Sequence, residues 1–168
     1  RGSPSPFPQS LDTPADAVEA PAIEAPAAIL ADLDDGQMML GKAPEVRRPV
    51  ASLTKVMTAL LVLQRRALDD VVVVSPLAVF ESDDYGASST LGLRAGERRT
   101  VRELLDALML QSANDAASAL AIEISGSEAR FVALMNDRAR VLGMRDTEFF
   151  SPSGLDDRGR STARDLLT

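Results

Sequence analysis

The feature that most constrains the fold is the segment 52–64, in which apolar side chains occupy almost every side of a predicted helix. The apolar members are Leu53, Val56, Met57, Ala59, Leu60, Leu61, Val62 and Leu63. A helix that is apolar all round is buried in the core of a domain and does not lie on its surface. We therefore expect this helix at the centre of the domain.

The composition removes several classes of chemistry. The 168 residues include no histidine and no cysteine, and the formal net charge is −7. Within this chain these absences exclude a Ser-His-Asp triad, a Cys-His pair, zinc sites built from thiolate or imidazole, and redox disulfides. A general base must be a carboxylate, a lysine or the single tyrosine, Tyr85. The acidic balance, without a basic stripe or stacking aromatic residues, argues against a nucleic acid partner.

The N-terminal segment differs in composition from the rest. Residues 1–26 are rich in Pro, Ala, Ser and Asp without periodicity, which predicts an extended leader. No apolar run approaches the roughly 18 residues that a membrane helix needs, and residues 1–10 lack the apolar core of a signal peptide. As given, the chain is predicted to be soluble, with one domain or part of one in residues 27–168.

Turn and capping residues divide the domain into elements. We expect strands at 27–33, 37–41 and 71–74, mostly loop over 76–99, helices near 52–64, 101–111, 114–125 and 128–142, a strand-like segment at 147–150, and a helix opened by Ser161 or Thr162. Asp34-Asp35-Gly36 supplies the tight turn of a hairpin. Thr100 and Glu103 fit a capping box, and Gly126 and Gly143 are suited to end helices.

Lys55 is a candidate general base. It follows Ser52 by three residues in the predicted buried helix, so the two side chains share one face about a turn apart. Burial disfavours an ammonium ion and lowers the pKa of a lysine. A neutral amine beside Ser52 takes the hydroxyl proton during attack on a carbonyl, which nucleophilic catalysis without histidine requires. The helix N-terminus near Ser52 favours developing negative charge.

A structural interpretation competes with this one. Ser52 can serve as an N-cap, and Lys55 can carry its charge to the surface along its apolar stem. The structural interpretation is favoured on the tetrapeptide alone, because Ser-x-x-Lys is common by chance. A second sequence motif is needed before the catalytic interpretation of Ser52 and Lys55 is favoured.

Ser112-Ala113-Asn114 falls where one predicted helix ends and the next begins. A hydroxyl and a carboxamide projected from such a loop can reach a neighbouring cleft, where Ser112 relays a proton and Asn114 holds a substrate amide. Ordinary capping by Ser112, Asn114 or Asp115 is the alternative, and it is favoured for this motif in isolation. The two motifs together are stronger than either alone.

Ser-x-x-Lys followed by Ser-x-Asn is similar to two of the three motif elements of the penicillin-recognising serine enzymes. The surrounding residues resemble the low-molecular-mass penicillin-binding proteins that are D-alanyl-D-alanine carboxypeptidases. The resemblance is carried by residues 48–59, 110–117, 149–156 and 161–165. It extends from about Ala28 to the end of the chain, and several matches stand in the right order.

The resemblance implies a role for each motif residue. Ser52 is expected to be the acylated nucleophile, Lys55 its general base, Ser112 a catalytic group that moves protons, and Asn114 a residue that binds the substrate peptide. The family's third motif, Lys-Thr-Gly on an edge strand, has no match here, because neither lysine is followed by Thr-Gly. In the family that strand supplies a contact to the substrate carboxylate and half of the oxyanion hole. Truncation, cleavage or omission of a C-terminal segment is the simplest explanation.

The fold implied by the resemblance is α/β (α+β), of the penicillin-binding-protein and β-lactamase type, with an antiparallel sheet and a helical subdomain. Residues 27–168 then form the N-terminal portion of a D,D-peptidase catalytic domain whose C-terminal strands are missing from this chain. The implied reaction removes the terminal D-alanine from peptidoglycan stem peptides through an acyl-enzyme on Ser52, with β-lactams as covalent inhibitors. We expect no metal and no cofactor. Because peptidoglycan lies outside the cytoplasmic membrane, we expect an exported protein whose membrane anchor, if it has one, lies outside this chain.

Two alternatives stay open. A class A β-lactamase shares Ser-x-x-Lys but needs a dedicated glutamate for fast deacylation, and no convincing glutamate motif follows Ser112-Ala113-Asn114. A catalytically incomplete cell-wall-binding module binds stem peptide without forming an adduct on Ser52.

Overall fold

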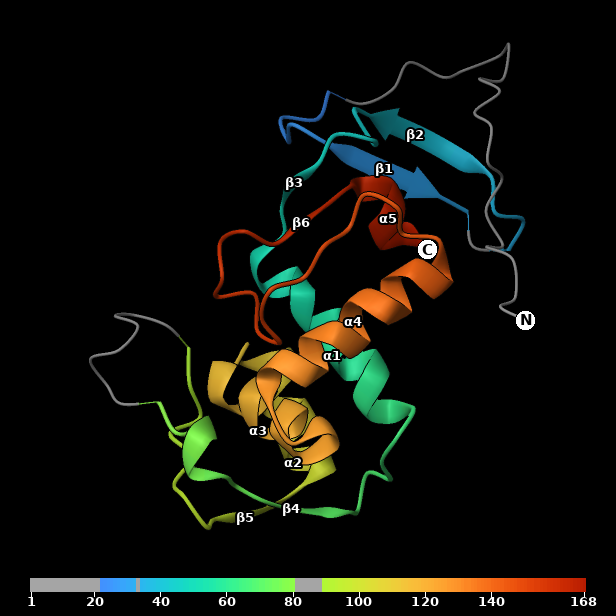
Figure 1. The fold of residues 1–168 in the computed structure, drawn as a ribbon. Helices are drawn as coiled ribbons and strands as arrows, with labels where there is room; N and C mark the ends of the chain where they lie inside the picture. The colour runs from blue at the N-terminus through green and yellow to red at the C-terminus, as the bar shows by residue number, and fades with distance from the viewer. Residues whose placement is uncertain (1–21, 33, 81–88) are drawn as a thin grey trace. The chain divides into compact units, whose positions relative to one another are not determined.

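The structure is a computed structural model that describes residues 22–32, 34–80 and 89–168. In chain order the elements are β1 (Ala28–Ala31), β2 (Met38–Lys42), β3 (Arg48–Pro49), α1 (Thr54–Leu63), β4 (Val71–Val73), β5 (Arg98–Thr100), α2 (Val101–Leu110), α3 (Asn114–Ser125), α4 (Glu128–Leu142), β6 (Arg160–Ser161) and α5 (Ala163–Leu167) (Figure 1). Single 3₁₀ turns cover Ala51–Leu53 and Pro76–Ala78. Most of the predicted leader, 1–26, lies outside the described residues.

The described residues form two compact units. Unit 1 comprises the described residues up to Arg48 together with 138–148 and 160–168, and unit 2 comprises the described residues of 49–137 and 149–159. Helix α4 belongs to unit 2 as far as Asp137 and to unit 1 from Arg138 onwards. The residues of the two candidate motifs, Ser52 and Lys55 of the first and Ser112 and Asn114 of the second, all lie in unit 2.

Unit 1 contains the predicted hairpin. Strands β1 and β2 pair antiparallel, with Ala28 opposite Lys42, which confirms the two short strands. Gly36 adopts a φ of +72° in the turn, a conformation that glycine reaches without a steric penalty. The turn is closed by the amide of Gly36, which donates to the carbonyl of Asp32 at 3.0 Å. The local pattern of turn and strand residues was therefore sufficient to predict this element.

The second half of unit 1 is organised by a buried carboxylate. Thr162 caps α5, because its hydroxyl accepts a hydrogen bond from the amide of Asp165 at 3.0 Å. The carboxylate of Asp165 accepts from the amide of Asp146 and the hydroxyl of Thr147. The predicted cap at the start of the last helix is therefore confirmed, and the same helix holds the segment that follows α4.

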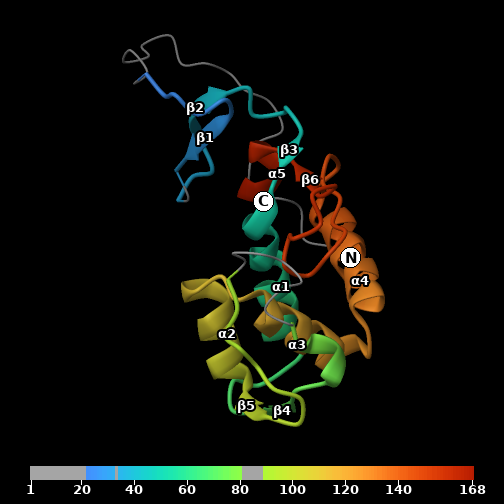
Figure 2. The ribbon, with the colours of Figure 1, turned by 90° about the vertical axis from the view of Figure 1, so that its left-hand side faces the viewer.

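Helices α1, α2 and α3 pack together in unit 2 and form its apolar core with β4 (Figure 2). The capping box at the start of α2 is present, since the Thr100 hydroxyl accepts from the Glu103 amide while the Glu103 carboxylate accepts from the Thr100 amide. Gly126 ends α3 with a φ of +78°. The predicted helices of this region are confirmed, because their start and stop signals are local.

The expectation that the segment 52–64 is buried on almost every side is wrong for the described residues. Met57, Leu61 and Val62 are buried, but Leu53, Val56 and Leu63 form a stripe that is more than half exposed. Apolar periodicity shows which side chains can be buried, whereas burial itself depends on what packs against each face.

Three strands were missed by the sequence interpretation: the two-residue strands β3 and β6, and β5. Residues 98 and 99 were expected to belong to a segment that is mostly loop, and Thr100 to cap the next helix, yet 98–100 form β5, which pairs antiparallel with β4. Arg98 and Arg99 carry no apolar alternation, so the strand has no local signature. Its backbone hydrogen bonds to the valine strand β4 form it, and Figures 1 and 2 show the pair beside α2 and α3.

No helix in the described ranges combines the length and the apolar character that crossing a bilayer demands.

Candidate active site

Ser52 and Lys55 stand at the start of α1. Ser52 lies in the 3₁₀ turn Ala51–Leu53 that leads directly into α1, and Lys55 lies in the helix's first turn. No side chain caps this helix, and Lys55 is only 3% exposed. The structural interpretation, an N-cap serine and a lysine that reaches the surface, therefore does not hold.

The Lys55 ammonium makes three hydrogen bonds. Its Nζ lies 3.1 Å from Ser52 Oγ, 2.8 Å from Asn114 Oδ1 and 2.9 Å from the carbonyl oxygen of Ser153. None of these partners is a carboxylate, so no negative charge among them stabilises the ammonium form. Desolvation by burial lowers the pKa of Lys55 from its ordinary value of 10.5 to about 8.

The partners of Lys55 determine what the neutral amine does. A neutral amine has two N–H bonds and one lone pair. Asn114 Oδ1 and the Ser153 carbonyl can only accept, so they take the two N–H bonds. The lone pair is then directed at the remaining partner, the Ser52 hydroxyl. This arrangement is that of a general base beside a nucleophile.

Ser112 supplies a second hydroxyl. It lies between α2 and α3 with a φ of +57°, a left-handed conformation that non-glycine residues seldom adopt. Its Oγ donates to Ser52 Oγ at 3.0 Å. The N-cap of α3 is Ala113, and no side chain caps this helix. The capping interpretation of the second motif therefore fails, and the strained turn directs Ser112 toward Ser52.

Asn114 begins α3 and faces the same group of atoms. Because its Oδ1 accepts from Lys55, its Nδ2 is the donor side of the amide. Asn114 and Ser52 line a cavity of about 400 Å³, and Ser52 is exposed there. Other lining residues include Ser89, Ser112, Leu155 and Asp156. Three of the four motif residues, Ser52, Ser112 and Asn114, thus line one cavity. Lys55 does not line it and is linked to it by its hydrogen bond to Ser52 Oγ.

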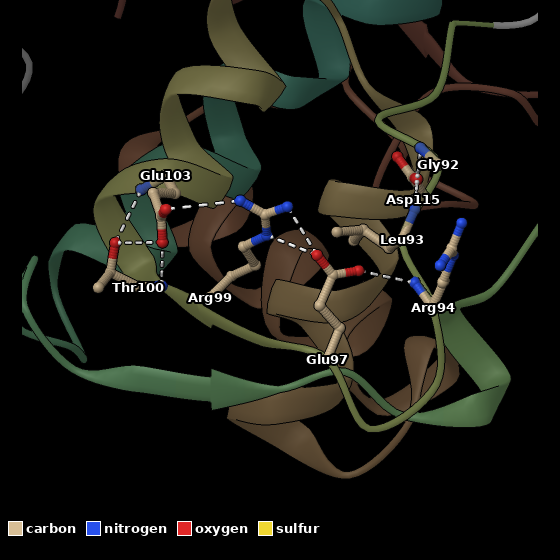
Figure 3. A network of polar contacts seen from close by, with 8 residues as sticks. All are labelled: Gly92, Leu93, Arg94, Glu97, Arg99, Thr100, Glu103 and Asp115. Atoms are coloured by element: carbon tan, nitrogen blue, oxygen red, sulfur yellow. Dashed lines mark hydrogen bonds and ion pairs between the residues drawn. The ribbon is translucent and has the colours of Figure 1, made fainter.

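Asp115, next to Asn114, carries a buried carboxylate that the sequence interpretation considered only as a cap. Asp115 is 1% exposed, and its oxygens accept from the amide of Leu91 and from those of Gly92 and Leu93, which Figure 3 shows. The amide of Asn114 donates to the Ser89 carbonyl at 2.9 Å. Backbone amides so arranged satisfy a buried carboxylate without a counter-ion. Asp115 therefore fastens residues 91–93 to α3.

An exposed polar network follows this segment along the chain, and Figure 3 also shows it. Arg99 pairs with Glu97 and with Glu103. The backbone amide of Arg94 and the Arg99 guanidinium hold the pKa of Glu97 below its usual range. This network ties β5 to the first turn of α2.

The segment 151–156 also contributes to the site, since Gly154, Leu155 and Asp156 line the cavity. The Thr58 hydroxyl donates to the Pro152 carbonyl at 2.7 Å, and the next carbonyl, that of Ser153, accepts from Lys55. Arg158 donates to Asp156 and lowers the pKa of that carboxyl group to about 2, so Asp156 is ionised beside the cavity. Sequence reasoning predicted a turn here but assigned it no part in the site, because every residue has a carbonyl and sequence cannot show which one meets a lysine.

Two residues outside the motifs, Tyr85 and Lys42, carry side chains that could in principle serve as a base. Tyr85 lies outside the described residues. Lys42, the other lysine, is exposed and donates to the Ile23 carbonyl. Within the described ranges, no three acidic side chains are grouped as a metal site would need.

Comparison with known sequences decides the family. The sequence profile of peptidase family S11, described as D-alanyl-D-alanine carboxypeptidase, matches residues 14–168. The chain belongs to this family. The resemblance inferred from the two motifs is thereby confirmed.

Individual relatives of this S11 chain agree with the profile. D-alanyl-D-alanine carboxypeptidase DacB2 of Mycobacterium tuberculosis is 40% identical over 157 residues, which are 92% of this chain and 52% of that protein. The D-alanyl-D-alanine endopeptidase of Pseudomonas aeruginosa is 36% identical over 141 residues, which are 83% of this chain and 44% of that protein. The S11 chain spans about half the length of the curated relatives it matches.

Solved structures confirm the fold class. Penicillin binding protein 6B from Escherichia coli superposes with a TM-score of 0.86 at 34% identity, over 92% of this chain and 51% of that chain. The α/β (α+β) fold implied by the resemblance is therefore the fold of this S11 chain, which contains the part of it described above.

Proposed function

We propose that this chain is the N-terminal part of the catalytic domain of a serine-type D-alanyl-D-alanine carboxypeptidase. The observation that carries the proposal is the buried Lys55 Nζ, 3.1 Å from Ser52 Oγ, in a chain of family S11. Burial lowers the pKa of Lys55 to about 8, so a useful fraction of the amine is neutral near pH 7. A lysine base is also the option that a chain without histidine retains.

The first step forms the acyl-enzyme. The neutral Lys55 amine takes the Ser52 hydroxyl proton while Oγ attacks the carbonyl carbon of the penultimate D-alanine in a peptidoglycan stem peptide. Ser112 donates a hydrogen bond to Ser52 Oγ and is placed to relay the proton. The tetrahedral intermediate collapses, the C–N bond breaks, and the proton passes to the leaving terminal D-alanine.

The second step is hydrolysis. Water attacks the ester carbonyl, Lys55 takes a proton from that water, and the proton returns to Ser52 Oγ as the shortened peptide leaves. Asn114 Nδ2 is positioned to donate to a peptide carbonyl in the cavity. The N-terminus of α1, which follows Ser52, favours the negative charge of the intermediate. In the family a Lys-Thr-Gly strand completes the oxyanion hole, and this sequence has no match to it.

The proposal extends to inhibitors and location. A β-lactam presents a reactive amide to the same nucleophile, so we expect penicillins to acylate Ser52. Relatives and structural neighbours carry the names carboxypeptidase and penicillin binding protein. Because peptidoglycan lies outside the cytoplasmic membrane, we propose an exported enzyme of the cell wall or periplasm that acts in wall biogenesis and cell shape.

The two alternatives are less well supported. A class A β-lactamase needs a glutamate for deacylation, and among the described residues that line the cavity the acidic ones are Asp156 and Asp157. A pure binding module does not need a desolvated lysine against a serine hydroxyl. A related endopeptidase is known by name, so cleavage of cross-linked peptides is tested beside the carboxypeptidase reaction.

Intact mass spectrometry of the full-length protein after penicillin treatment tests the proposal. A stable adduct that is lost in Ser52→Ala supports a carboxypeptidase of this family. Loss of the drug without an adduct supports the β-lactamase. If neither an adduct nor loss of the drug is observed, the result supports the binding module. Release of D-alanine from a pentapeptide, compared with cleavage of a cross-linked dimer, then separates carboxypeptidase from endopeptidase.

A further inference from the structure

Gly154 touches the backbone that carries the nucleophile. A Cβ atom at this position would lie 1.9 Å from the carbonyl oxygen of Ala51 and 2.4 Å from its carbonyl carbon. Real side chains do not tolerate such distances, so only a glycine allows this approach. The φ of Gly154 is +83°, which adds a second reason for glycine.

The contact between Gly154 and Ala51 links the segment that bonds the base, Lys55, to the turn that carries the nucleophile, Ser52. On one side Ala51 directly precedes Ser52, and its own φ of +42° is unusual for a residue with a side chain. On the other side Ser153 directly precedes Gly154, and its carbonyl accepts from Lys55 Nζ. The position of one glycine therefore affects both the turn that presents the nucleophile and the acceptor that orients the base.

The segment around Gly154 is held firmly enough to transmit a displacement. Ser151 Oγ accepts from the amide of Gly154 at 2.9 Å and from that of Asp156 at 3.3 Å. The Thr58 hydroxyl fixes the Pro152 carbonyl from α1. These bonds make the segment 151–156 a hydrogen-bonded turn attached to α1.

The segment has space to move without unfolding. Among the described residues, a second cavity of about 480 Å³ is lined by Ser151, Ser153, Leu155 and Asp156 of the same segment. An added methyl group at position 154 would collide with Ala51, and we expect a movement of the segment away from Ala51 to relieve the collision. The movement would withdraw the Ser153 carbonyl from Lys55.

We propose that Gly154 is a positioning residue for acylation, whose bare Cα sets the distance between the segment 151–156 and the turn Ala51–Leu53. The proposal rests on the proposed function and deepens it, because Gly154 acts through Ser52 and Lys55. A misplacement of about 1 Å at a reacting group costs roughly 10²-fold in rate.

Gly143 is a matched control. It shares the φ of +83°, but a Cβ atom there meets nothing within 4 Å. Gly143→Ala therefore measures the cost of backbone strain alone, whereas Gly154→Ala adds the collision with Ala51. The rate of acylation by a fluorescent penicillin is measured for both variants of the full-length protein from pH 6 to 10, together with their melting temperatures.

We expect Gly143→Ala to acylate at the wild-type rate and Gly154→Ala to be slowed by roughly 10²-fold. We also expect the pH dependence of Gly154→Ala to move to higher pH. The movement of the segment would hydrate Lys55. Because burial is what lowers the pKa of Lys55, hydration raises that pKa, and the neutral amine then forms only at higher pH. A loss of stability alone does not move a pH profile.

A second pair keeps the test decisive if Gly154→Ala does not fold. Thr58→Val removes the hydroxyl that holds the Pro152 carbonyl, and Thr58→Ser keeps it. We expect slower acylation and the same alkaline shift in Thr58→Val, with both restored in Thr58→Ser.

The outcomes separate the two proposals. A wild-type protein that penicillin does not acylate overturns the proposed function and this inference together. A wild type that is acylated, with Gly154→Ala matching Gly143→Ala and Thr58→Val matching Thr58→Ser in rate and pH dependence, overturns this inference alone.

Discussion

Helices α1 and α2 both have ten residues and both belong to unit 2, yet they bury different kinds of side chain. In α2 the buried set is apolar throughout, and the polar residues of its first two turns are exposed. In α1 the buried set includes Thr54, Lys55 and Thr58, while the apolar Val56 and Leu63 are more than half exposed. Helix α2 therefore follows the rule that apolar side chains are buried and polar ones exposed, and helix α1 departs from it.

The difference shows where chemistry overrides the hydrophobic effect. Burial of Lys55 is unfavourable, because its lowered pKa corresponds to about 3 kcal/mol against the ammonium form at neutral pH. Hydrogen bonds to Asn114 and Ser153 offset part of that cost. Helix α2 carries no such cost, since its buried face is hydrophobic and its start is capped. The strained φ angles of Ala51 and Ser112 also lie beside Ser52 and not in α2.

The largest expected effect separates the two lysines. Lys55→Met in the full-length protein should slow acylation by penicillin by about 10³- to 10⁴-fold, because methionine fills a similar space and cannot accept a proton. Lys42→Met should leave the rate unchanged, since Lys42 is exposed and donates to a backbone carbonyl. The rate is measured by stopped-flow or quenched gel assays. A Lys55→Met protein that keeps a tenth of the wild-type rate would contradict the role of this lysine.

A substitution on the buried face of α2 should lower stability and leave the acylation rate unchanged. Leu104 is fully buried, so Leu104→Ala should lower the free energy of unfolding by about 2–5 kcal/mol. The acylation rate of the folded fraction should stay near that of the wild type. Denaturant unfolding measures the first quantity, and Leu110→Ala is the control, because Leu110 is 82% exposed and its loss should cost no more than about 0.5 kcal/mol.

The pH dependence of stability sharpens the comparison further. The pKa of Lys55 is about 8 in the folded protein and near 10.5 in the unfolded chain, so between these values the unfolded chain binds one more proton. The free energy of unfolding should therefore rise with pH across this window. From pH 7 to 9.5 the wild type should gain about 2 kcal/mol more than Lys55→Met. Equal slopes for the two proteins in urea titrations would show that Lys55 is not desolvated.

The smallest expected effect lies at the start of α2. Thr100→Ala removes one half of the capping box and should lower the free energy of unfolding by about 1 kcal/mol. Thr100→Ser retains the hydroxyl and should recover most of the loss. Neither variant should alter the pH dependence of acylation, because the capping box joins Thr100 to Glu103, whereas Lys55 bonds to Ser52, Asn114 and Ser153. Thermal unfolding of the three proteins measures the difference.

The sequence predicted more of the fold than of the site. The hairpin, α2, α3 and α4 were located from turn, capping and periodicity signals that act within a few residues. Strand β5 was missed because only its pairing with β4 makes it a strand. Likewise, Asp115 looked like a possible cap, and its hydrogen bonds to the amides of 91–93 depend on how that segment packs on α3.

By itself the sequence determined which residue types are available for catalysis and where most helices begin and end, since both follow from composition and local interactions. Only the tertiary structure decided that Lys55 is buried, that Asn114 meets it from 59 residues away, and that the Ser153 carbonyl meets it from 98 residues away. Desolvation and hydrogen-bond geometry arise where distant segments pack together, and no short stretch of sequence contains them.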